Sequence, residues 1–142
     1  MRRRVWVRDP HSGGATIPLA VRQRTERRIR AYAESRYAGK FVGLDIRFRG
    51  ALCYVDAYTE PEIPSRGLLR ALGETRQQYL RRVRNVPLHL CRLRYFGNDE
   101  AWSMAFYTYS NERYEPCTFP NSAFYGTPEG AFEVGAIYLR AR

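Results

Sequence analysis

The sequence lacks the segments that would mark a membrane or exported protein. No apolar run approaches the roughly 20 residues that a membrane-spanning helix needs. The start, MRRRVWVRDP, is basic, but it is not followed by the apolar segment and small-residue cleavage site of a signal peptide. We therefore expect a cytoplasmic protein that does not bind membranes.

Cysteine and histidine are also scarce. The three cysteines, Cys53, Cys91 and Cys117, include no CxxC pair, which argues against a disulfide framework or a zinc knuckle. His11 lies in a glycine-rich loop and His89 at a strand start, and His11 with Ser12 forms no catalytic triad, because no positioned acid or oxyanion element can be identified. The sequence therefore predicts no cofactor and no catalytic residues, and it favours a binding module over an enzyme.

Lysine is nearly absent, because 24 side chains are lysine or arginine and only Lys40 is a lysine. Arginine suits bidentate phosphate contacts and base stacking, although the codon bias of a GC-rich genome would give the same ratio. The net charge is +10, and such a field attracts polyanions. Residues 1–49 hold 13 basic and 4 acidic side chains, a net +9, and residues 66–94 hold 8 and 1, a net +7. This segmentation predicts a nucleic acid, DNA or RNA, or an acidic protein as partner.

The length of 142 residues and the hydrophobic content of 44% predict a single folded domain over residues 1–142. Apolar spacings of three and four predict helices, and strict alternation predicts hairpins. In chain order we expect a short strand at 5–7, a helix over 18–38, a hairpin over 44–58, a helix over 68–84 that Gly73 could interrupt, a hairpin over 90–109, a short strand around 114–119 and a helix over 127–139.

The predicted fold class is α+β, in the order αββαββα. Residues 17–60 and 66–110 each form an αββ unit, so the two units make a pseudo-repeat. Residues 1–16 are expected to be flexible, and residues 111–142 supply a C-terminal loop and helix. One apolar face per hairpin predicts a single antiparallel sheet with its helices packed on one face. The helix over 68–84 should bury an apolar stripe there.

Each predicted hairpin divides its side chains into two faces. With Gly50-Ala51 as a two-residue turn, one apolar face contains Leu44, Ile46, Phe48, Cys53, Val55 and Ala57. The second hairpin has a similar face containing Cys91, Leu93, Tyr95, Trp102, Met104 and Phe106. Leu90 is predicted on the opposite face, beside arginines and tyrosines.

These opposite faces give the main candidate site. If both hairpins join one sheet, the shared face carries Arg47, Arg49, Tyr54, Tyr58, Arg92, Arg94, Tyr107 and Tyr109. Aromatic rings on a sheet can stack with unpaired bases while arginines bind phosphates. The same residue types suit a solvated surface, or the interface of a homodimer or other protein complex, and both alternatives stay open.

The two basic helices are further candidates, because a row of arginines can follow a phosphate backbone. Their candidate residues are Arg24, Arg27, Arg81 and Arg82. Such charge runs also occur simply as solvated helix faces. The sequence thus predicts a basic nucleic-acid-binding module of low sequence specificity.

Asp45 and Asp56 are directly opposed in the predicted register, and a like-charged pair of this kind is unfavourable unless something lies between them. Opposed carboxylates could hold Mg²⁺ for phosphodiester hydrolysis, so a metal-dependent nuclease is the third and least favoured function. Alternatively, Asp45 pairs with Arg47 or Arg92.

Overall fold

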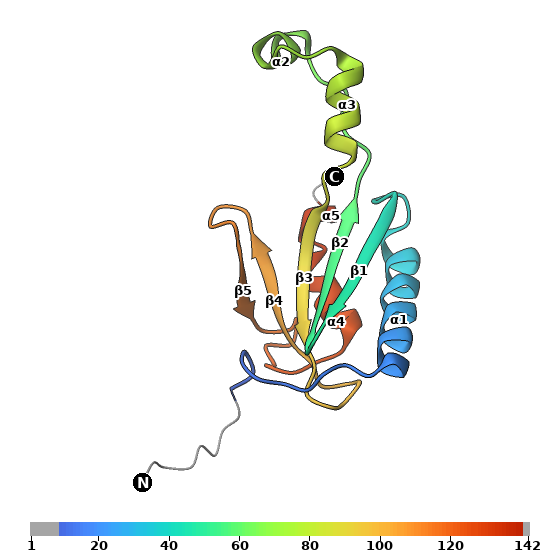
Figure 1. Ribbon diagram of the computed structural model, residues 1–142, viewed down its shortest axis with the longest axis vertical. Helices are drawn as coiled ribbons and strands as arrows, with labels where there is room; N and C mark the ends of the chain where they lie inside the picture. Colours follow the sequence, from blue (N-terminus) through green and yellow to red (C-terminus); the bar gives the residue numbers. More distant parts are fainter. Residues whose placement is uncertain (1–8, 141–142) are drawn as a thin grey trace.

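The computed structural model describes residues 9–140, so the expected strand at 5–7 lies outside the described residues (Figure 1). Within that range, no helix is both long enough and apolar enough to cross a membrane. The elements are α1 (Leu19–Tyr37), β1 (Gly43–Arg49), β2 (Leu52–Tyr58), α2 (Arg66–Leu72), α3 (Arg76–Arg84), β3 (Leu88–Arg94), β4 (Ser103–Thr108), β5 (Arg113–Cys117), α4 (Pro128–Gly135) and α5 (Ile137–Arg140).

The five strands form one antiparallel sheet in the order β1-β2-β3-β4-β5, which confirms the α+β class and the single antiparallel sheet. Helices α1 and α4 lie together behind this sheet (Figure 1). The core between the two layers includes Ile29, Val55, Leu93, Trp102 and Phe132, all fully buried. We call the opposite side of the sheet, which no described helix covers, the open face.

The first hairpin has the predicted register. Arg47 pairs with Tyr54, and Asp45 lies opposite Asp56. Gly50 takes a φ of 59° at the first turn position, where a two-residue hairpin turn of this kind requires glycine. Alternation from this turn places the apolar side chains of β1 and β2 toward the helices and the arginines and tyrosines on the open face.

The second hairpin also pairs as predicted, with Cys91 opposite Phe106. A β-bulge nevertheless interrupts the pairing of β2 with β3. Val55 pairs with Cys91, but the next residue, Asp56, pairs with His89, so that Leu90 is the extra residue. The prediction that Leu90 lies on the open face is therefore wrong. Its side chain is fully buried in the core, and His89 occupies the position on the open face.

Helix α4 packs closely over this bulge. The helix begins as predicted, with Thr127 as N-cap accepting a hydrogen bond from the Gly130 backbone N–H at 3.1 Å. At the last residue of the helix, a Cβ added at Gly135 would lie 2.6 Å from the Leu90 carbonyl oxygen. Glycine is therefore required where helix and strand backbones approach each other.

The segment over 68–84 forms two helices, α2 and α3, with Gly73 at a φ of 69° between them. They project beyond one end of the sheet as an arm (Figure 1). None of their residues is buried, and Leu72 is 47% exposed, so the predicted buried stripe is wrong. Because β2 and β3 are neighbours in the sheet, the arm is an insertion between two paired strands. The pseudo-repeat and the packing of every helix on one face are accordingly not confirmed.

We predict that Gly135→Ala destabilises the protein by about 1–3 kcal/mol, because the added Cβ must push α4 away from the bulge backbone. Chemical denaturation monitored by circular dichroism measures this change. Gly43→Ala is the matched control, since a Cβ there meets nothing within 4 Å, and it should change stability by less than about 0.5 kcal/mol. Equal effects of the two substitutions would contradict the close approach.

Candidate functional site on the open sheet face

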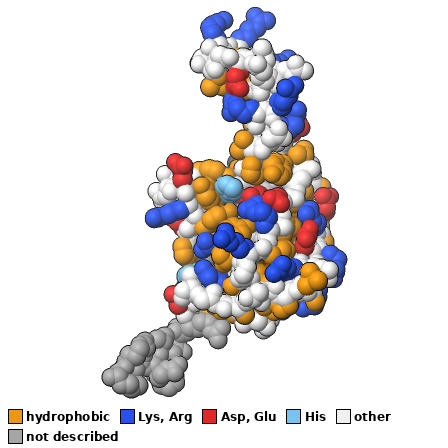
Figure 2. Space-filling view, viewed as in Figure 1, with side chains coloured by type: hydrophobic (Ala, Val, Ile, Leu, Met, Phe, Trp, Pro, Cys, Tyr) orange, Lys and Arg blue, Asp and Glu red, His pale blue; other side chains and the backbone are white. Residues whose placement is uncertain are grey.

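The arginines and tyrosines of the two hairpins lie in rows across the open face. One row runs from Arg47 through Tyr54 to Arg92, and the next runs from Arg49 through Leu52 to Arg94. Figure 2 shows basic side chains gathered over the middle of the sheet on this side of the molecule. The structure therefore brings the stripes of β1, β2 and β3 into one continuous surface.

A buried carboxylate, Asp56, organises one end of this surface. Asp56 is only 1% exposed although it points to the open face. Its Oδ2 accepts a hydrogen bond from Arg47 Nη1 at 2.8 Å, and its Oδ1 lies 3.0 Å from His89 Nδ1. Arg47 Nη1 also donates to Asp45 Oδ2 at 2.7 Å. The hydrogen bonds to Asp56 and Asp45 raise the pKa of Arg47, despite the opposing effect of burial.

The position of Arg47 explains the opposed carboxylates, since its guanidinium lies between Asp45 and Asp56. This contact is one of the two alternatives that the sequence left for Asp45. Among residues 9–140, no group of three or more His, Cys, Asp or Glu side chains is placed to hold a metal ion.

Sequence reasoning missed His89 as a site residue. A carboxylate can only accept hydrogen bonds, so His89 Nδ1 donates to Asp56, and in the neutral imidazole Nε2 is then the acceptor. The ring centroid of His89 lies 4.7 Å from that of Tyr107, and its plane is within 14° of the Tyr109 ring at 6.4 Å. The His89 backbone N–H donates to the Tyr109 hydroxyl at 2.7 Å. The histidine is therefore held both through its ring and through its backbone.

Tyrosine rings fill the space beside His89. Tyr114 of β5, which sequence reasoning also missed, lies 5.1 Å from Tyr107 and 5.6 Å from Tyr54, measured between ring centroids. Burial raises the pKa of Tyr114. Arg92 stacks over the Tyr114 ring at 5.3 Å from its centroid. Tyr58, the last residue of β2, pairs with Gly43 on the outer strand β1.

Three arginines of the open face, Arg49, Arg92 and Arg94, make no carboxylate ion pair within residues 9–140. Arg94 donates to the Gly13 carbonyl oxygen at 2.9 Å. Burial lowers the pKa of Arg94, and the positive charge of Arg92 lowers it further. The two arginines therefore repel each other, and a bound anion would relieve this repulsion.

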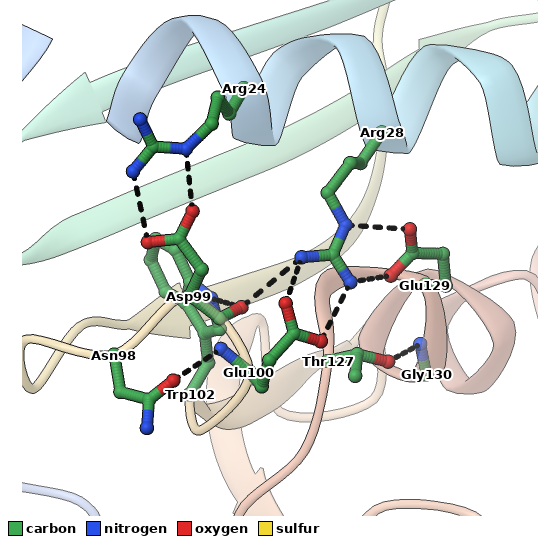
Figure 3. A network of polar contacts seen from close by, with 9 residues as sticks. All are labelled: Arg24, Arg28, Asn98, Asp99, Glu100, Trp102, Thr127, Glu129 and Gly130. Carbon is green, nitrogen blue, oxygen red and sulfur yellow. Dashed lines mark hydrogen bonds and ion pairs between the residues drawn. The ribbon is translucent and has the colours of Figure 1, made fainter. Parts of the chain in front are cut away.

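The basic helices do not join this surface. Helix α1, which carries Arg24 and Arg27, lies on the other side of the sheet. Arg24 pairs with Asp99 at 2.8 Å, and its neighbour Arg28 pairs with Glu100 at 2.6 Å and Glu129 at 2.7 Å (Figure 3).

The arm has its own charged contacts. Arg82 pairs with Glu74 at 2.8 Å within the arm, and Arg81 is exposed on α3. Both arginines lie on α3, which projects beyond one end of the sheet and does not lie across its open face (Figure 1).

Comparisons with protein-family models, with curated proteins and with solved structures found no match to this chain. The assignment of function therefore rests on the side chains of the open face.

We predict that Arg47→Met destabilises the protein by about 1–3 kcal/mol, because buried Asp56 loses its arginine partner. Arg49→Met removes the same charge from the same strand without breaking a carboxylate contact within the described residues. Thermal unfolding of the two variants side by side measures the difference. If Arg49→Met is as damaging as Arg47→Met, the Asp56 contact does not stabilise the fold.

Proposed function

We propose that this protein binds single-stranded nucleic acid across its open face, with low sequence specificity. The observation that carries the proposal is the group of Arg49, Arg92 and Arg94 on a sheet face that also carries a tyrosine cluster. Arginines without carboxylate partners can bind phosphates at little cost, because no existing ion pair must break. A sheet surface suits an unpaired strand, whose bases can turn toward aromatic side chains.

The proposed binding depends more on phosphate contacts than on stacking. Tyr54 and Tyr114 are partly buried, and Arg47 and Arg92 stack over their rings. Tyr109, at 43% exposed, is the most accessible tyrosine of the cluster. One stacked base contributes on the order of 1–3 kcal/mol. Contacts of this kind recognise the backbone and the flat faces of bases, so little sequence preference is expected.

A titration of single- and double-stranded DNA and RNA at several salt concentrations tests the proposal. Three phosphate contacts to a single strand give a slope of about −2 for log affinity against log salt concentration. We expect tighter binding to single strands and this degree of salt dependence. Absence of binding at about 50 mM salt, or binding that salt does not weaken, would overturn the proposal.

We predict that Arg92→Gln combined with Arg94→Gln lowers affinity for a single strand by roughly 10- to 100-fold and makes the salt slope less steep by about 1.4. The matched control is Arg27→Gln combined with Arg81→Gln, which removes the same charge from exposed positions on α1 and α3. Fluorescence anisotropy measures both variants. If the control loses as much affinity, the basic helices or the overall charge bind the ligand rather than the open face.

A second candidate is a protein-interaction subunit or homodimer that buries the same face. Exposed apolar side chains where the arm joins the sheet favour this candidate: Ile63 is 69% exposed and Val86 58%. Light scattering on the purified protein separates the two functions. A stable dimer that dissociates on Tyr109→Ser, together with absence of nucleic-acid binding, would replace the first proposal by the second.

A further inference from the structure

The open face also carries the elements of acid–base chemistry, and we propose that His89 is the general base of a metal-independent RNA cleavage reaction. The inference rests on the proposed function, because the RNA must lie on the face that carries His89. It adds to that function an activity and a substrate class, RNA rather than DNA.

His89 is held as a catalytic histidine needs to be. Its Nδ1 donates to Asp56, and Asp56 is itself held by Arg47, so the ring is fixed in one tautomer with Nε2 as the acceptor. The backbone N–H of His89 is bound to the Tyr109 hydroxyl, which limits movement of the strand at this point. The arrangement is a histidine oriented by a buried acid, and no serine or cysteine among the described residues makes a hydrogen bond with the ring.

Nε2 of His89 is available to a ligand. The side chain is 33% exposed, and no residue within 9–140 makes a hydrogen bond with Nε2. The β-bulge creates this position, because regular pairing would place Leu90 opposite Asp56 instead. Bulges of this kind commonly turn a side chain toward a functional site.

The substrate class follows from the nucleophile that His89 would activate. Because no serine or cysteine among the described residues makes a hydrogen bond with the ring, that nucleophile comes from the substrate or from water. RNA brings one that is already in place, because each ribose carries a 2′-hydroxyl beside the phosphate, and DNA does not.

The proposed step balances without a metal or a co-reactant. Nε2 of His89 takes the proton of the 2′-hydroxyl, and the 2′-oxygen forms a bond to phosphorus. The bond from phosphorus to the 5′-oxygen breaks, and that oxygen takes a proton from water. The imidazolium then returns its proton to the hydroxide so formed. The products are a 2′,3′-cyclic phosphate and a 5′-hydroxyl, and nothing is oxidised or reduced.

Arg92 is placed to stabilise the charge that develops on the phosphate. Arg92 and His89 lie on the same strand and the same face, and both contact the ring of Tyr114. Along the strand they are separated by at most about 10 Å at roughly 3.3 Å per residue, a distance that the long arginine side chain can shorten. An arginine aimed at a developing phosphate charge is a common source of transition-state stabilisation.

The test uses the full chain, a 5′-labelled single-stranded RNA and the DNA of the same sequence, all in EDTA. Affinity and cleavage rate are measured separately. We expect both oligonucleotides to bind, and only the RNA to be cleaved, leaving 2′,3′-cyclic phosphate ends. His89→Asn should lower the cleavage rate by roughly 100- to 10,000-fold, the usual contribution of acid–base catalysis, while affinity changes by less than about threefold.

His89→Asn is the matched variant because the asparagine amide can still donate to Asp56 from nearly the Nδ1 position, so the fold should be retained. Binding without cleavage in EDTA overturns this inference and leaves the proposed function intact. Absence of binding overturns both. Cleavage that requires Mg²⁺, or that His89→Asn leaves unchanged, also overturns the inference, the first in favour of a metal-dependent nuclease and the second in favour of a contaminating enzyme.

Discussion

The extra residue that Leu90 adds to β3 is the constraint on which both layers of the molecule depend. On one side of the sheet it places the Leu90 backbone against Gly135, so that α4 packs at a short distance. On the other side it shifts the register by one and brings His89 opposite Asp56. The same local irregularity therefore sets the packing of the helix layer and the composition of the open face. A regular strand would have put a leucine beside a buried carboxylate, where it could not satisfy the Oδ1 acceptor.

The two layers also differ in how their charges are arranged. Two arginines of α1, Arg24 and Arg28, bind acids from the C-terminal third of the chain, where acidic residues outnumber basic ones. Asp99 binds Arg24, and Glu100 and Glu129 bind Arg28. These ion pairs connect α1 to α4 and to the loop before β4. On the open face, Asp45 and Asp56 both form ion pairs with Arg47. The charge blocks of the sequence thus compensate each other in the helix layer and leave arginines of β1 and β3 without acidic partners among the described residues.

Much of the sheet could be predicted from sequence, because alternation fixes which side of a strand is apolar and a glycine turn fixes the register. The bulge was missed although it left a signal: Leu90 and Cys91 are adjacent apolar residues between two alternating runs, and both are buried. His89 and Tyr114 could not be recognised as site residues without that shift and without the pairing of β5. The arm was mispredicted for a different reason. Periodicity identifies the apolar side of a helix, but it does not specify what covers that side.

Arg47 and Arg92 illustrate why similar residues on one face need not have similar roles. Both stack over tyrosines, at 5.5 Å and 5.3 Å from the ring centroids. If Arg47 moved to a phosphate, the buried Asp56 carboxylate would lose one of its hydrogen-bond donors. Removing a partner from a buried charge destabilises the folded state. Arg92 makes no ion pair with a carboxylate among the described residues. The phosphate contacts that we propose therefore lie on β3, next to His89, because an arginine there can bind an anion without taking a partner away from a buried acid.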